Sequence, residues 1–281
     1  MQVKQLLCGA VMKSRKIKMT IEEFHRLPFR PAWKQEYYKG FLVETPREAV
    51  AHATISIQPR LTNSPVPLRH ILEEDQQVLL PCFKAAFEDA FEFCDYTPEK
   101  FEKAAIESLH RTFGAPAHPC LQVSRVALGP PKSRDANKPI GAALVVQLPD
   151  DWVLLDALFV TPEWQRRGVG NALVAVALNE IHKIGGYRGM VSRYYLGNEP
   201  SCAWHHRFGF KEEPDFLLAR LYLRAAAQEL TRLRALGTLT PDLEHNLTQE
   251  RARWQSEVDR LDSLLDEGRE EEAFPWRKWQ R

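Results

Sequence analysis

Hydrophobic positions change their spacing several times between residues 66 and 224. Apolar residues at every third or fourth position predict helices over about 75–93 and 97–113, and Gly114 ends the second. Three apolar segments then follow in quick succession, CLQVSRVAL, IGAALVVQL and WVLLDALFV, and each predicts a strand. The segments that join them, GPPKSRDANKP and PDD, are polar turn sequences, which favours antiparallel pairing of these strands.

The alternation of helices and strands continues after the third strand. The sequence predicts a helix over about 171–184, a strand in GMVSRYYL, a short helix in EPSCAWHHRF and a final strand in FLLARLYL. Together these elements predict an α/β domain over residues 66–224, with a mixed, mostly antiparallel sheet flanked by helices.

The two ends of the chain predict extensions of this domain. Residues 1–65 form an N-terminal extension of unknown role, with a short helix and a strand or hairpin in QEYYKGFLVETP. Residues 225–281 form a C-terminal helical extension with one apolar stripe, made of Leu243, Leu247, Trp254, Val258, Leu261 and Leu265. We interpret this stripe as packing within its own chain, with a homodimer as the alternative.

Composition narrows the classes of function only a little. Hydrophobic residues make up 44% of the chain and charged residues 27%, as in an ordinary globular protein, and the net charge of +1 favours neither a nucleic-acid nor a membrane partner. No apolar run reaches the length of a membrane span. The cysteines are odd in number and include no CxxC pair, which predicts a reducing, cytoplasmic compartment and no metal site. They are Cys8, Cys82, Cys94, Cys120 and Cys202.

The segment VTPEWQRRGVGNALV combines features that suit a phosphate group. Pro162 lacks an N–H donor and therefore marks the end of strand pairing, while Gly168 and Gly170 allow a tight turn or a close approach by a ligand. Arg166 and Arg167 add two positive charges before the positive end of a helix dipole. The sequence therefore predicts a phosphate or pyrophosphate site, with a tight turn bearing surface arginines as the alternative. No nucleoside-triphosphate loop or dinucleotide fingerprint is present.

Two segments resemble the GCN5-related N-acetyltransferase (GNAT) family. LFVTPEWQRRGVGNALV resembles the family's acyl-CoA signature, V-x-P-x-x-[QR]-x-x-G-x-[GA], with matches at Val160, Pro162, Gln165, Gly168 and Gly170. NEPSCAWHHRFGF resembles a second family segment, with matches at Asn198, Ser201, Gly209 and Phe210. The resemblance covers about residues 66–224.

The resemblance implies acetyl-CoA as the acyl donor. The pyrophosphate of coenzyme A is then expected on backbone N–H groups of residues 166–171, and the pantetheine arm is expected in a gap between two strands. The implied binding residues are Phe159, Val160, Gln165, Arg166, Arg167, Gly168, Val169, Gly170, Asn171 and Asn198.

The catalytic residues are less clearly indicated. His205 stands where the family usually has the tyrosine that protonates the leaving thiolate. A histidine is the stronger acid of the two, with an ordinary pKa near ~6.5, but it could also replace the tyrosine only in packing. Water, Tyr194 or Tyr195 would then supply the proton.

Asp156 is the candidate base, because a carboxylate is unusual in the apolar segment VLLDALF. Strand alternation predicts that it shares a face with Leu158 and Val160. A structural acid and a chain of waters are the alternatives. Some protein-lysine acetyltransferases of the family carry a glutamate at the position of Leu154, so a protein-lysine acceptor is not favoured.

The expected function is transfer of an acetyl group from acetyl-CoA to an unidentified amine acceptor by direct attack in a ternary complex. A non-catalytic acyl-CoA-binding regulatory module is one alternative. A toxin-type acetyltransferase that acts on aminoacyl-tRNA is another; the near-neutral composition disfavours it, and only the basic N-terminal extension supports it.

Overall fold

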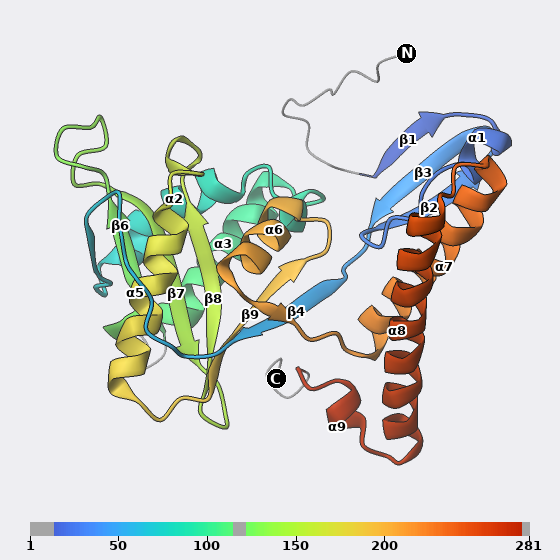
Figure 1. The fold of residues 1–281 in the computed structure, drawn as a ribbon. Helices are drawn as coiled ribbons and strands as arrows, with labels where there is room; N and C mark the ends of the chain where they lie inside the picture. Colours follow the sequence, from blue (N-terminus) through green and yellow to red (C-terminus); the bar gives the residue numbers. More distant parts are fainter. Residues whose placement is uncertain (1–13, 115–121, 277–281) are drawn as a thin grey trace. The chain divides into compact units, whose positions relative to one another are not determined.

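The computed structural model describes residues 14–114 and 122–276 (Figure 1). The chain divides into two compact units, which we describe separately. The described part of the first unit comprises residues 53–114, 122–193 and 204–211, and that of the second unit comprises residues 14–52, 194–203 and 212–276. Cys8 and Cys120 lie outside the described residues, whereas the thiols of Cys82, Cys94 and Cys202 are free.

A seven-stranded sheet provides the frame of the first unit (Figure 1). Its strand order is β10-β4-β9-β8-β7-β6-β5. Strands β5, β6, β7 and β8 pair antiparallel in sequence, and β8 pairs parallel with β9. The strands are β4 (Val50–Ile55), β5 (Leu68–His70), β6 (Arg125–Leu128), β7 (Pro139–Gln147), β8 (Trp152–Val160), β9 (Gly189–Tyr195) and β10 (Lys211–Glu212). The prediction of a mixed, mostly antiparallel sheet flanked by helices is therefore confirmed.

Helices cover both faces of this sheet (Figure 1). They are α2 (Asp75–Phe87), the 3-10 turn η1 (Phe91–Phe93), α3 (Pro98–Phe113), α5 (Val169–Ile184) and α6 (Glu199–Phe208). Helices α2 and α3 bury an apolar cluster against β7 and β8, in which the rings of Phe83, Phe87 and Phe159 are in contact. The predicted helix 75–93 is interrupted after Phe87, so η1 forms a separate turn.

A buried ion pair fixes the start of α2. Both carboxylate oxygens of Asp75, which is 1% exposed, accept hydrogen bonds from Arg69, at 2.6 and 2.7 Å. The N–H of Leu72 donates to the same carboxylate at 2.8 Å. Burial by itself would raise the pKa of Asp75, but these bonds outweigh burial and hold the pKa below its usual range.

We expect Asp75→Asn to lower the free energy of unfolding by about 2 kcal/mol at pH 7, because it leaves a partly buried guanidinium without its charge partner. The folded-state pKa of Asp75 is lowered, so its ion pair contributes to the free energy of unfolding above the unfolded-state pKa of about 3.9. This contribution is lost as the pH falls through the folded-state pKa. Urea unfolding of both proteins at pH 7 and pH 3 measures this. A difference that stays constant between the two pH values would contradict the ion-pair explanation.

The described part of the second unit contains a three-stranded antiparallel sheet and four complete helices. The sheet has the order β1-β3-β2, and α1 lies between β1 and β2 in the chain. The elements are β1 (Arg15–Lys18), α1 (Ile21–His25), β2 (Trp33–Tyr38), β3 (Phe41–Pro46), α7 (Phe216–Leu236), α8 (Pro241–Asp266) and the short α9 (Glu270–Ala273). Helix α8 packs against α7, with the rings of Trp254 and Tyr222 4.7 Å apart. Four residues of the apolar stripe, Trp254, Val258, Leu261 and Leu265, thus pack within their own chain, whereas Leu243 is exposed.

The predicted final strand in FLLARLYL is wrong, because these residues form the first two turns of α7. Asp215 caps the helix by accepting a hydrogen bond from the N–H of Leu218 at 2.9 Å. The buried positions of α7 recur at helical spacing through Ala226, Leu230 and Leu233. The eight residues of FLLARLYL alone are too few to distinguish the apolar stripe of a helix from the apolar run of a buried strand. None of the described helices is long and apolar enough to cross a membrane.

Candidate functional site

The glycine turn directly follows β8. The side chain of Gln165 donates a hydrogen bond to the carbonyl of Val160 at 3.0 Å, which ties the turn to the end of the strand. Arg166 and Gly168 both have positive φ angles, 58° and 84°, so the backbone adopts the left-handed region twice within three residues. The sequence provides a glycine at only one of these two positions, and Arg166 carries the strain at the other.

The turn leads into the N-terminus of α5, which has free donors. Gly168 is the N-cap and supplies no side-chain hydrogen bond, and the first intrahelical bond runs from the N–H of Ala172 to Gly168. The N–H groups of Val169, Gly170 and Asn171 therefore have no acceptor within the helix. Two exposed arginines precede them, and the guanidinium of Arg167 lies 5.0 Å from the ring centre of Trp164. The arrangement is suited to binding phosphate.

We expect Gly168→Ala to lower the free energy of unfolding by about 1–2 kcal/mol, because a side chain disfavours the left-handed region. Steric contact is not the cause, since a Cβ at Gly168 meets no atom within 4 Å. Gly170→Ala is the matched control: its Cβ would make ordinary contacts at 3.8 Å with Leu158 and Trp204, in a helical backbone. Thermal unfolding of both variants measures the difference, and equal melting temperatures would refute this account.

Strands β8 and β9 are paired over only part of their length. Their parallel pairing runs from Trp152 and Gly189 to Leu155 and Ser192, and β8 continues to Val160 without further pairing to β9 in the described residues. One edge of β8 is therefore open beyond Leu155. An open strand edge offers backbone donors and acceptors to an extended ligand.

The register with β7 determines which residues of β8 face this open edge. Thr161 donates its N–H to the carbonyl of Ile140 at 2.8 Å. Because hydrogen-bonded pairs alternate along antiparallel strands, the backbone groups of Phe159 are directed towards β7, and those of Leu158 and Val160 towards the open edge. The geometry thus favours Leu158, with Val160, for the backbone role that the sequence assigned to Phe159.

Asp156 lies in a β-bulge next to the start of the open edge. Leu144 pairs with Ala157 and Val145 with Leu155, so Asp156 is the extra residue of β8. This bulge breaks the strict alternation that was used to place Asp156 on the face of Leu158 and Val160. Strand alternation therefore no longer supports that placement, because it is valid only in an unbulged strand.

Two arginines surround the carboxylate of Asp156, which is 2% exposed. Arg193 of β9 donates a hydrogen bond to Oδ1 at 3.2 Å, and the Nε of Arg111 in α3 lies 3.7 Å from Oδ2. Oδ2 is buried and has no hydrogen-bond partner in the described part of the chain. It is the free acceptor of this cluster, and sequence reasoning missed both arginines because they are distant in the chain.

Helix α6 connects the glycine turn to the point where β8 and β9 separate. The indole Nε1 of Trp204 donates to Oδ1 of Asn171 at 2.8 Å. The next residue, His205, is 4% exposed, and its Nε2 lies 2.7 Å from the hydroxyl of Ser192, the last paired residue of β9. The rings of Trp204 and Phe210 both contact the imidazole edge-on. Ser192 had no recognisable signal as a site residue in the sequence.

The remaining predicted residues lie in the second unit. Asn198 begins α6 and accepts a hydrogen bond from the N–H of Ser201 at 3.0 Å, so its side-chain oxygen has a capping role. Tyr194 is buried and donates its hydroxyl to Glu212 at 3.2 Å. Burial and the nearby Glu212 carboxylate raise the pKa of Tyr194, which makes it a poor proton donor near neutral pH. Within the described ranges, no cluster of side chains could hold a metal ion.

Comparisons with known proteins agree with the two sequence motifs. The model of the acetyltransferase (GNAT) family matches residues 84–210. A search of curated proteins gives no match. Similar solved structures include a GCN5-related N-acetyltransferase from Sphaerobacter thermophilus, with 14% identity over 73% of this chain and 59% of that one, and a TM-score of 0.44.

Two further similar structures contain bound ligands. PaiA N-acetyltransferase from Thermoplasma acidophilum, in complex with coenzyme A, has 16% identity over 53% of this chain and 91% of that one, with a TM-score of 0.40. AAC(6')-Iy, in complex with a bisubstrate analogue, has 19% identity over 54% of this chain and 94% of that one, with a TM-score of 0.38. The chain spans less than two thirds of the Sphaerobacter protein. The family match shows that this chain carries a domain of the GNAT acetyltransferase family at residues 84–210.

Proposed function

We propose that this protein is an N-acetyltransferase that transfers the acetyl group of acetyl-CoA to an amine acceptor by direct attack in a ternary complex. One observation carries the proposal: the open edge of β8 has the cationic turn at one end and the bulge with Asp156 at the other. A ligand with a phosphate group and an extended amide arm complements both parts of this arrangement.

Coenzyme A would be held mainly by backbone groups. The N–H groups of Val169, Gly170 and Asn171 would bind the pyrophosphate, and Arg166 and Arg167 would add charge at the same turn. The pantetheine amides would pair with the open edge at Leu158 and Val160. Gln165 and Gly168 shape the turn, whereas Phe159 supports β8 from the β7 side and Asn198 caps α6.

Direct attack requires two proton transfers. The acceptor nitrogen would form a bond to the thioester carbonyl carbon as the C–S bond breaks, and the nitrogen would lose a proton. We assign that proton to Oδ2 of Asp156, the buried oxygen without a hydrogen-bond partner. The departing thiolate would take a proton from His205, whose orientation is fixed by Ser192.

The proposal is tested by thiol release from acetyl-CoA against a panel of amines, peptides and aminoacyl-tRNA. Release that depends on one acceptor class, with the acetylated acceptor found by mass spectrometry in equal amount, would establish the reaction. Acetyl-CoA binding without release from any acceptor would instead favour a binding module. Release only with aminoacyl-tRNA, together with steeply salt-dependent binding, would favour the toxin-type reaction.

A further inference from the structure

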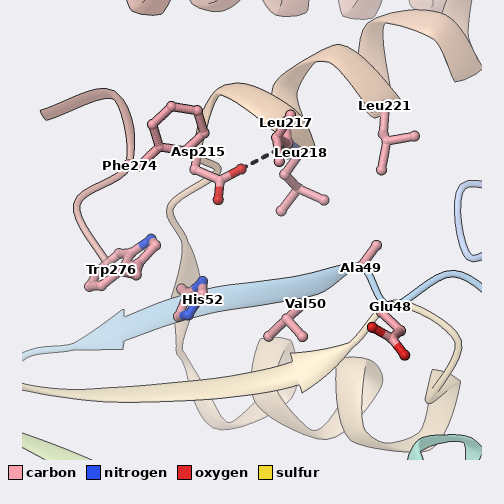
Figure 2. A pocket seen from close by; sticks show the side chains of 10 residues that line it. All are labelled: Glu48, Ala49, Val50, His52, Asp215, Leu217, Leu218, Leu221, Phe274 and Trp276. Carbon is pink, nitrogen blue, oxygen red and sulfur yellow. Dashed lines mark hydrogen bonds between the residues drawn. The ribbon is translucent and has the colours of Figure 1, made fainter. Parts of the chain in front are cut away.

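A cavity of about 230 Å³ lies within the second unit (Figure 2). None of the residues assigned to acetyl transfer lines it. Its walls come from residues 48–52, from the start of α7, and from the segment after α9, all of which belong to the second unit. The lining residues are Glu48, Ala49, Val50, His52, Asp215, Leu217, Leu218, Leu221, Phe274 and Trp276.

Packing fixes the walls of this cavity. The rings of His52 and Trp276 are stacked, with centroids 5.0 Å apart and planes 14° apart. The indole of Trp276 also donates a hydrogen bond to the carbonyl of Glu213 at 3.2 Å. Leu218 and Phe274 are 3% and 8% exposed, so the apolar walls are held by the core of the unit. A cavity with such walls exists before any ligand binds.

The charged groups of the lining have one sign. Glu48 and Asp215 carry carboxylates, and the lining contains no lysine or arginine. Asp215 uses one oxygen to cap α7, and Figure 2 shows its carboxylate and that of Glu48 on either side of the space. No ion pair joins Glu48 or Asp215 to another residue that the structure describes. Beside apolar walls, two carboxylates without an ion-pair partner among the described residues favour a cationic ligand.

We propose that this cavity binds a small protonated amine with an apolar ring. The ring would occupy the space between Val50, Leu218 and Phe274, and the ammonium group would pair with the carboxylate of Glu48 or of Asp215. A volume of about 230 Å³ is below the roughly 300–1,000 Å³ of sites for drug-sized ligands, which limits the occupant to about one ring system. This binding site is additional to acetyl transfer and does not depend on it.

Calorimetric titration of the full chain with three ligands of one shape tests the charge requirement. The ligands are 2-phenylethylamine, 2-phenylethanol and 3-phenylpropionate, titrated without acetyl-CoA so that no amine is consumed. We expect the amine to bind about tenfold more tightly than the alcohol, and the carboxylate to bind more weakly still. Equal affinities for the amine and the alcohol would overturn the proposal.

Two matched variants assign the binding to this cavity. Glu48→Gln removes a charge from an exposed position of the lining, and we expect it to weaken 2-phenylethylamine binding about fivefold, because Asp215 remains. Glu250→Gln, exposed on α8, should leave that affinity unchanged. Equal effects of the two variants would place the amine elsewhere and reject the site. The amine site would also be rejected if the chain self-associates and Glu48→Gln abolishes that self-association. A second copy of the chain would then be the occupant of the cavity.

Discussion

Replacing His205 with phenylalanine should lower kcat for thiol release by about 100- to 1,000-fold, the range expected for losing a general acid. The Kd for acetyl-CoA should change little, because His205 contributes no atom to the glycine turn or to the open edge of β8. Phenylalanine suits the site sterically, since His205 already lies between the rings of Trp204 and Phe210. Stopped-flow thiol detection and equilibrium binding measure the two quantities on the same preparation.

The glutamine variant separates proton donation from packing. His205→Gln preserves a hydrogen-bonding group near the Ser192 hydroxyl, but an amide does not release a proton near neutral pH. We expect its kcat to be as low as that of the phenylalanine variant. His206→Ala, at the exposed neighbouring position, is the control. Recovery of the rate in His205→Gln would assign a purely structural role to His205.

The elements that position the site could be predicted because their signals are local. The Gly114 end of the second predicted helix and the three apolar strand segments each depend on a few adjacent residues, and the corresponding α3, β6, β7 and β8 are all present. The GNAT domain was equally predictable, because its signature requires a turn whose residues are consecutive. The family match confirms that expectation.

The features that could not be predicted depend on pairing between distant segments. The bulge at Asp156 arises from the register of β7 against β8, and no pattern within VLLDALF reveals it. The same register decides that Leu158, and not Phe159, faces the open edge. The Asp156 cluster likewise joins Arg111 and Arg193, which are 45 and 37 residues away in the chain. The prediction of a strand in FLLARLYL was wrong because the signals of a helix, the cap at Asp215 and the later turns of α7, lie outside these eight residues.

The double variant Arg166→Gln/Arg167→Gln should raise the Kd for acetyl-CoA by about 10- to 30-fold at low ionic strength. Both side chains are exposed, so each charge contributes at most about 1 kcal/mol to binding a phosphate group. Glutamine has a Cβ as arginine does, so the backbone strain at the positive φ of residue 166 is the same in both proteins and the comparison isolates charge from strain. Equilibrium binding in 20 mM and 500 mM salt measures the loss, which should shrink at the higher salt because the arginine–phosphate attraction is screened.

Two comparisons make this result specific to the turn. Arg251→Gln removes an equally exposed charge from α8 and should leave the Kd unchanged. Repeating the measurement with dephospho-coenzyme A identifies the phosphate concerned. We expect the same fold loss for both ligands, since the arginines adjoin the free N–H groups of α5 that would hold the pyrophosphate. A loss that disappears with dephospho-coenzyme A would assign the arginines to the 3′-phosphate instead. An unchanged Kd in the double variant would mean that the backbone donors and helix dipole alone bind the phosphate groups.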